Sequence, residues 1–315
     1  MTKSLKVVYM AGGADYTILP LNEILKSSHE LIHVYTKHPK PAGRGKRIMP
    51  NTLQKFLEEN KLPYSMPKDL KSKEVIDNLK KMKPDLILVF SFGHILSQDV
   101  LNIPKLGCLN IHASILPKWR GPSPVQYAIL NNDKETGYSI MIMNKGVDEG
   151  KILHSESLAI QESDNTLSLL YKITSLACNS IIEVITKYSE GKLRSTNQNN
   201  KNVSYSYIIK KNETYLDFNE DADTILQKIK AYNPNPGAKC FVNGELIKII
   251  EAKKEILYNN KEPGIILDKN FLISCKTNAI RPRVLQREGK KPLKLAEALN
   301  GWKVSPGHLV KNKKE

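Results

Sequence analysis

Short β-rich runs and helical segments alternate over the first 190 residues, and this alternation restricts the fold more than any other feature of the sequence. The run LKVVYM ends in Gly12-Gly13 and is followed by apolar residues at helical spacing, and DLILVF at residues 85–90 is a fully apolar strand. Strands separated by helices join as parallel crossovers, so this region predicts a doubly wound, Rossmann-like α/β sheet domain. One long amphipathic helix is expected over residues 163–189.

The composition changes after Gly191. Residues 194–202 read RSTNQNNKN, a polar run that predicts a linker. Farther on, Asn243-Gly244 separates two short β-rich runs, which is a strong signal for a hairpin. More short runs follow and favour a small β-barrel, OB-like in type. We therefore expect a catalytic domain over residues 1–190, a linker over 191–206 and a C-terminal barrel domain over 207–315.

The chain of 315 residues carries a formal net charge of +16. A polyanionic partner such as nucleic acid would explain that charge, and so would a composition that is simply rich in lysine. No window of about 18 uncharged apolar residues occurs, so we expect no membrane span. The N-terminus lacks the pattern of a secretory signal, and we expect a cytoplasmic protein. Without heptads or an apolar surface stripe, a monomer is the expected state.

The four cysteines are far apart in the sequence, and no cysteine and histidine spacing is typical of a zinc site. We expect buried free thiols and no metal. GRGKRI at residues 43–48 does not fit a phosphate-binding loop, and Gly12-Gly13 lacks the dinucleotide fingerprint, so neither ATP nor NAD is expected.

Polar residues end two of the predicted strands at the edge where ligands bind in such sheets. Asn110 and His112 have the same parity in one strand, so their side chains point to the same side. An amide and an imidazole there can bind an oxygen on which negative charge develops. Asp148 follows a strand that can lie beside theirs, and its carboxylate can orient the imidazole. A purely structural histidine at a strand end is the alternative, although the rigid proline-rich loop after it favours a preorganised site.

Two long segments carry a family resemblance. NIHASILPKWRGPSP at residues 110–124 and DKETGYSIMIMNKGVDEG at 133–150 resemble the formyltransferases that use 10-formyltetrahydrofolate. The resemblance implies that Asn110, His112 and Asp148 are the catalytic set. It also implies folate contacts in two places, which are Ser114, Ile115, Leu116 and Pro117 in the loop, and Phe90, Phe92 and Gly93 at the end of an apolar strand. The first loop, Gly12-Gly13-Ala14-Asp15-Tyr16, departs from the usual Gly-Thr/Ser-Pro-Asp/Glu-Phe.

Three further segments resemble the branch of that family that acts on methionyl initiator tRNA. They are KPAGRGKRIMP at residues 40–50, YNPNPGA at 232–238 and LQREGKKPL at 285–293. The resemblance implies that tRNA is bound by basic residues of the first and third segments, which are Lys40, Arg44, Lys46, Arg47, Lys290 and Lys291. Gly43 and Gly45 would let Arg44 approach a base or a phosphate closely.

The expected reaction is attack of the methionyl α-amine on the formyl carbon of 10-formyltetrahydrofolate, without a covalent enzyme intermediate. Asn110 and protonated His112 would stabilise the tetrahedral oxyanion, and Asp148 would orient His112 and help to move the amine proton. Three other readings are a sugar-amine N-formyltransferase, a hydrolase that releases formate, and an RNA-binding protein with a relic site. The basic loop argues against the first, and the complete Asn, His and Asp set argues against the last.

Overall fold

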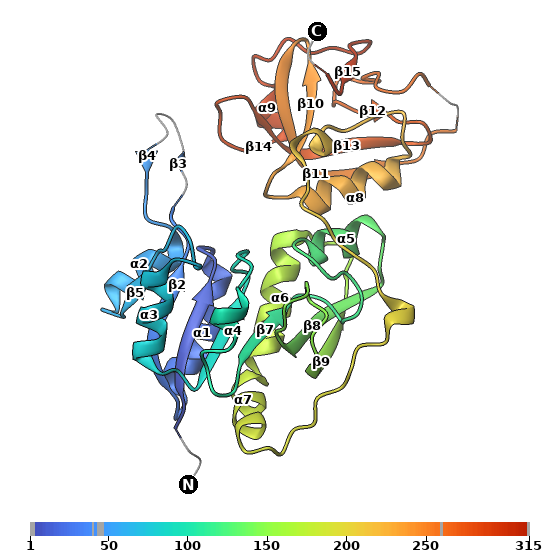
Figure 1. Cartoon of the computed structure of the whole chain (residues 1–315). Coiled ribbons are helices and arrows are strands. Elements are labelled where there is room, and N and C mark those ends of the chain that lie inside the picture. Colours follow the sequence, from blue (N-terminus) through green and yellow to red (C-terminus); the bar gives the residue numbers. More distant parts are fainter. Residues whose placement is uncertain (1–3, 40, 43–46, 259–260, 314–315) are drawn as a thin grey trace. The chain divides into compact units, whose positions relative to one another are not determined.

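The computed structural model describes residues 4–39, 41–42, 47–258 and 261–313. Within these ranges the chain divides into two compact units (Figure 1). Unit 1 comprises residues up to 124 together with 135–159 and 170–206. Unit 2 comprises 207–315 together with 125–134 and 160–169. The polar run that the sequence assigns to a linker therefore belongs to unit 1.

The described part of unit 1 contains a seven-stranded sheet with the order β5-β2-β1-β6-β7-β8-β9. Its first five strands in that order are parallel, whereas β8 is antiparallel to both β7 and β9. The predicted doubly wound, Rossmann-like sheet is confirmed, with an antiparallel edge that the sequence did not indicate. The strands are β1 Lys6–Ala11, β2 Glu30–Thr36, β5 Tyr64–Ser65, β6 Leu86–Phe90, β7 Cys108–His112, β8 Glu135–Ile142 and β9 Ile152–Ala159.

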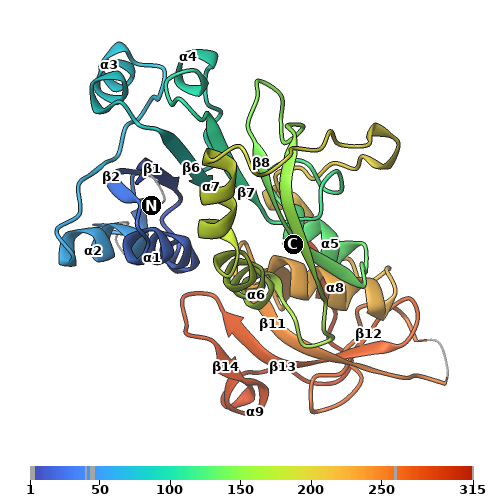
Figure 2. The same cartoon turned by 90° about the horizontal axis from the view of Figure 1, so that it is seen from below.

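Helices cover both faces of this sheet, because the parallel strands are apolar on both sides. Figure 2 shows α3 and α4 on one side of β1, β2 and β6, with α1 on the other. Val8 and Met10 of β1 pack in the cluster under α3 and α4, whereas the hydroxyl of Tyr9 donates to Thr17 O beneath α1. The first helices are η1 Asp15–Thr17, α1 Ile18–Lys26, α2 Thr52–Glu59, α3 Lys73–Met82 and α4 Gln98–Leu101. Two short strands, β3 Pro41–Ala42 and β4 Arg47–Ile48, form a separate pair.

The expected single helix over residues 163–189 is wrong. The structure has two helices, α6 Thr166–Cys178 and α7 Ile181–Ser189, bent by 42° at Asn179 and Ser180. A tertiary contact accompanies the break, because Ser180 Oγ hydrogen-bonds to the hydroxyl of buried Tyr138 as well as to Ala177 O. Among the described residues no single helix meets the length and hydropathy needed to cross a bilayer, although this bent pair does when taken together.

Unit 2 is built on an antiparallel, nearly closed barrel, which confirms the predicted second fold. The strands follow the order β12-β13-β11-β10-β15, and β14 pairs with β13. The expected hairpin joins β10 Ala238–Val242 to β11 Glu245–Glu255, and α8 Ala222–Tyr232 packs against β11. The other elements of unit 2 are β12 Ile273–Ser274, β13 Ala279–Arg287, β14 Leu293–Lys294, β15 Val310–Lys311, α5 Pro124–Leu130, α9 Leu295–Leu299 and the short helix η3 Lys211–Thr214, whereas the short helix η2 Asn200–Asn202 belongs to unit 1.

Candidate active site

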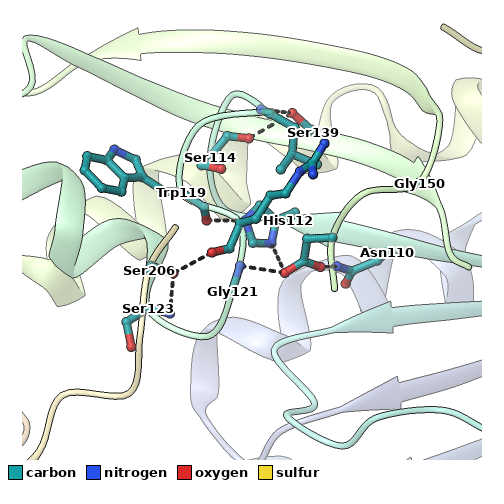
Figure 3. A network of polar contacts seen from close by, with 12 residues as sticks. Asn110, His112, Ser114, Trp119, Gly121, Ser123, Ser139, Gly150 and Ser206 are labelled. Carbon is teal, nitrogen blue, oxygen red and sulfur yellow. Dashed lines mark hydrogen bonds and ion pairs between the residues drawn. The ribbon is translucent and has the colours of Figure 1, made fainter. Parts of the chain in front are cut away.

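The carboxylate of Asp148 is the centre of a polar network that includes Asn110, His112 and Gly121, and Figure 3 shows these three partners near the end of β7. Asn110 Nδ2 donates to its Oδ1 at 3.3 Å, and the backbone amide of Gly121 donates to its Oδ2 at 2.9 Å. His112 Nδ1 lies 3.5 Å from the same Oδ2. Three residues that the sequence separates by up to 38 positions therefore meet, as their parity and strand positions predict.

The position of each side chain follows from the sheet. Asn110 pairs with Met141 and His112 with Ser139 across the antiparallel β7–β8 ladder. They lie on the same side of β7 as Cys108, which packs in the buried cluster. Asp148 lies in the turn between β8 and β9 and has a φ of 50°. This left-handed backbone returns the carboxylate toward the end of β7.

Both ring nitrogens of His112 are engaged. Nε2 lies 3.0 Å from the carbonyl oxygen of Trp119, which can only accept a hydrogen bond, so Nε2 carries a proton. Nδ1 faces the carboxylate of Asp148, and a proton held between them satisfies both groups. The side chains of His112 and Asp148 are only 6% and 15% exposed, so water screens this pair weakly. The arrangement can hold one proton at a defined place beside an amide donor.

The loop after β7 is fixed by contacts that the sequence did not indicate. Ser139 Oγ accepts from the backbone amide of Leu116 at 2.9 Å and donates to Ser114 O at 2.8 Å. Ser114 is itself buried, and its Oγ donates to Lys118 O. Ile115 and Pro117 are partly buried, and Leu116 is buried. A serine in the middle of a predicted strand carries no signal of its own, which is why Ser139 was missed.

Residues 198–206 hold the other side of this loop. Trp119 N donates to Ser204 Oγ at 3.0 Å, and Arg120 N donates to Ser204 O at 2.9 Å. Ser206 N donates to Arg120 O, and Ser206 Oγ accepts from Ser123 N. The segment that reads as a linker thus forms a backbone brace against the site loop.

The proposed folate residues of β6 lie at the neighbouring strand end. Phe90 is buried, and its ring centroid is 5.9 Å from that of Tyr16 in the unusual first loop. The Tyr16 hydroxyl lies 3.1 Å from Ser91 Oγ, and burial raises the pKa of this phenol, so Tyr16 is neutral. Phe92 is buried in the cluster under α3 and α4, so its side chain faces the core, whereas Gly93 is exposed with a φ of 63°.

The expected tRNA residues fall in two parts of the chain. Lys40, Arg44 and Lys46 lie outside the described residues, and Arg47 lies in β4. Lys290 and Lys291 are exposed in the turn between β13 and β14 of unit 2. Within the described ranges no group of three or more His, Cys, Asp or Glu side chains is arranged to hold a metal ion.

Comparison with known proteins gives the class to which this fold and site belong. A family model described as formyl transferase matches residues 5–185, and one described as formyl transferase, C-terminal domain, matches residues 208–303. The chain belongs to the formyl transferase family.

Two relatives of nearly the same length show which members of the family the chain resembles. The chain is 36% identical over 304 residues to a methionyl-tRNA formyltransferase of Ehrlichia canis, covering 95% of this chain and 98% of that one. It is 34% identical over 319 residues to the methionyl-tRNA formyltransferase of Pseudoalteromonas translucida, covering 98% of each.

Solved structures show the same fold at lower identity. HypX from Aquifex aeolicus in complex with tetrahydrofolic acid matches with a TM-score of 0.68 and 17% identity, over 94% of this chain and 47% of that chain. WlaRD, a sugar 3N-formyl transferase, matches with a TM-score of 0.64 and 20% identity, over 92% of this chain and 100% of that chain.

Proposed function

We propose that this protein transfers the formyl group of 10-formyltetrahydrofolate to the α-amine of methionyl initiator tRNA. The observation that carries the proposal is the meeting of Asn110, His112 and Asp148 at the carboxyl edge of the sheet. Family membership and similarity to two methionyl-tRNA formyltransferases over nearly the whole chain support the same reaction.

Asn110 is the proposed donor to the formyl oxygen. One hydrogen of its amide is directed to Asp148 Oδ1, and an amide nitrogen has two, so a second donor is available to an oxygen that gains negative charge. His112 has no spare nitrogen, because Nε2 is bound to Trp119 O and Nδ1 faces Asp148. A substrate oxygen would have to share the Nδ1 proton with Asp148. We therefore assign oxyanion stabilisation mainly to Asn110.

The His112–Asp148 pair is the proposed proton relay. A proton held between Nδ1 and Oδ2 would pass to N10 of the departing tetrahydrofolate, and the pair would take up in its place the proton that the amine loses, while the amide of Gly121 holds Oδ2 in position. Positioning two bound reactants beside such groups can itself supply about 7–11 kcal/mol of the barrier. When bound, 10-formyltetrahydrofolate supplies the activated one-carbon unit.

The chain offers matching groups for a folate at the end of β6. Among the described residues, the backbone amides of residues 92–95 donate no hydrogen bond, and Gly93 is exposed beside them. Free amides next to buried apolar strand residues suit a flat heterocycle with carbonyl and amine groups. We propose that these amides contact the folate together with the backbone of the loop Ser114–Pro117, rather than the buried side chains of Ser114 and Phe92.

For the tRNA we propose contacts from Lys40, Arg44, Lys46, Arg47, Lys290 and Lys291, on the strength of sequence resemblance and charge. We further propose that the protein acts as a monomer, with a catalytic domain over residues 1–190, a connecting segment over 191–206 and a tRNA-binding domain over 207–315.

One assay tests the function. The protein is given radiolabelled 10-formyltetrahydrofolate together with methionyl initiator tRNA, the RNA is isolated, and the formyl-methionine released from it by base hydrolysis is measured. Parallel reactions contain uncharged tRNA, methionyl elongator tRNA or a nucleotide-linked amino sugar. Formyl-methionine on initiator tRNA, with much less product in the other reactions, is the expected result. Formate release without tRNA, or transfer to the sugar amine alone, would contradict the proposal.

A further inference from the structure

The amide of Gln198 joins the turn that carries Asp148 to a buried arginine. Gln198 Nε2 donates to Asp148 O at 2.9 Å and to Gly150 O at 2.8 Å. Its Oε1 accepts from Arg120 Nε at 2.9 Å. A guanidinium only donates and a carbonyl only accepts, so one orientation of the amide satisfies all three bonds. Both amide hydrogens and the amide oxygen are therefore in use.

The turn needs such support. Asp148 has a φ of 50°, which is unfavourable for a residue with a side chain, and its neighbours Val147 and Glu149 are exposed. Among the described residues no backbone amide donates to Asp148 O or Gly150 O. The contacts from Gln198 are thus the ones that tie these two carbonyls to the rest of unit 1.

Arg120 holds Gln198 in place, and we call the contacts of Gln198 with Arg120 and with the Asp148 turn the clamp. Arg120 is only 4% exposed, and its Nη2 donates to Asn200 Oδ1 at 3.3 Å. No carboxylate of the described residues lies within ion-pair distance of it, so the partners of this guanidinium are neutral amides. The next residue, Gly121, donates to the carboxylate of Asp148. The same loop therefore holds Asp148 at the carboxylate directly and at the backbone through Gln198.

We propose that Gln198 is a positioning residue for formyl transfer, which fixes the Asp148 carboxylate against His112 while Arg120 fixes Gln198. This inference rests on the roles assigned above to Asp148 and His112. Gln198 itself does not touch the reacting atoms. Its loss lets the turn relax from the left-handed conformation, and the carboxylate moves away from Nδ1 of His112.

Gln198→Glu is the sharpest test, because it keeps size and the contact with Arg120 but removes both donors. Its carboxylate would face two carbonyl oxygens, which repel it. We expect kcat to fall about tenfold to a hundredfold, as for a displacement of about 1 Å at a reacting group. The KM values for both substrates and the melting temperature should stay near those of the unaltered protein. Gln198→Met, which is similar in length and uncharged, should lower kcat to a similar extent, but it also removes the acceptor of Arg120 Nε, so its melting temperature should fall.

Asn202→Ala is the matched control, since Asn202 is exposed in the same segment and its side chain makes no hydrogen bond among the described residues. It should keep full activity. Asp148→Asn supplies a second control. If Gln198 acts through Asp148, Gln198→Glu should lower kcat little further in the Asp148→Asn background. Wild-type kcat in both Gln198 variants, or full additivity with Asp148→Asn, would overturn the proposal.

A measurement without substrate separates this inference from the proposed function. The nitrogen-15 chemical shifts of the His112 ring report which ring nitrogen is protonated. In Gln198→Glu the Nδ1 signal should move toward its position in Asp148→Asn, whereas Asn202→Ala should leave it unchanged. An unchanged Nδ1 signal in Gln198→Glu contradicts the clamp even if the protein transfers formyl groups. A failure of the unaltered protein to formylate would refute the function and leave this test decisive.

Discussion

Arg120 in unit 1 and Arg281 in unit 2 are both largely withdrawn from solvent, but they have opposite kinds of partner. Arg120 is bound by the amide oxygens of Gln198 and Asn200. Arg281 lies between two carboxylates, with Nε 2.6 Å from Glu255 Oε1 and Nη2 2.7 Å from Asp268 Oδ2. Arg120 therefore has no acidic partner among these contacts, whereas the charge of Arg281 is balanced by two carboxylates.

The two regions use their polar groups in different ways. In the barrel, β13 repeats the paired pattern, since Arg287 binds Glu245 and packs on the ring of Trp302. Such ion pairs join neighbouring strands, and because their opposite charges cancel they leave little net electrostatic field. At the site, the neutral amide of Gly121 donates to the Asp148 carboxylate, and the amide oxygen of Gln198 accepts from Arg120, so both charged groups are held in place by neutral partners. Substitutions should therefore affect catalysis in unit 1 and stability in unit 2.

The largest expected effect is on catalysis alone. Asn110→Ala removes the proposed donor to the formyl oxygen, and kcat should fall about a hundredfold or more, equal to about 2.7 kcal/mol of transition-state stabilisation. The melting temperature should change little, because Asn110 is only partly buried. Asn60→Ala, which removes an exposed amide bonded to Phe56 O, is the control and should keep normal turnover. Near-normal kcat in Asn110→Ala would remove its catalytic role.

A second substitution, Gly121→Ala, should lower both stability and catalysis. Gly121 has a φ of 117°, and a Cβ added there would lie 2.2 Å from the backbone oxygen of Ser206. Gly121→Ala should cost about 1–3 kcal/mol of stability and also lower kcat, since the amide that holds Asp148 moves. Gly191→Ala has a positive φ but open space around it, and should lose stability without loss of kcat. Full activity in Gly121→Ala would show that the brace does not position the site.

How far the sequence predicts this site depends on the distance along the chain between partners. Strand parity alone places Asn110 and His112 on one side of β7, and the end of a neighbouring strand brings Asp148 within reach. Gln198 carries no such signal, because it lies in a polar run without periodicity and 50 residues from the turn that it holds. The structure shows that Arg120 is buried, and only then does the run rich in Asn and Gln become a source of hydrogen-bond partners for it.

For the fold as well, the sequence predicts the features that depend on neighbouring residues and not those that depend on distant contacts. Apolar runs and the Asn243-Gly244 turn predict the sheet domain and the barrel hairpin, since burial and turn geometry are local properties. The edge strand β9 was missed, because its outer residues are mostly exposed and its pattern is weakly apolar. The break between α6 and α7 depends on Tyr138, which lies 42 residues before Ser180 in the sequence. Tertiary contacts of this kind override the helical pattern.

In the barrel, acid should reveal the charge pairing. Hydrogen bonds from Arg281 lower the pKa of Glu255 from 4.5 to about 2, and Arg281 also lowers the pKa of Asp268. A carboxyl group with a lowered pKa in the folded state stabilises the fold above about pH 4.5, and that contribution is lost as the pH falls toward 2.

Arg281→Met should therefore reduce the free energy of unfolding at pH 7 by about 1–2 kcal/mol, since the partner carboxylates are partly exposed. Its stability should also fall less steeply between pH 5 and pH 2, as measured by urea unfolding. Formyl transfer should remain near normal. Arg283 lies on β13 like Arg281, but its ion pair with Glu251 of β11 is exposed. Arg283→Met should therefore change stability by less than about 0.5 kcal/mol. Equal pH dependence in Arg281→Met and the unaltered protein would contradict the role of Arg281.

The smallest effect tests whether pairing stabilises the barrel only where water is excluded. Lys254 Nζ lies 2.7 Å from Asp223 Oδ2 and joins β11 to α8, but the two side chains are 38% and 65% exposed. Lys254→Ala should lower the free energy of unfolding by less than about 1 kcal/mol, and the difference should vanish in about 1 M salt because the Debye length is then only about 3 Å. The effect of Arg281→Met should persist in the same salt, because Arg281 is only 17% exposed. Similar salt sensitivity in both variants would mean that burial does not separate the two pairs, and that the barrel is held by its apolar core rather than by the charges of β13.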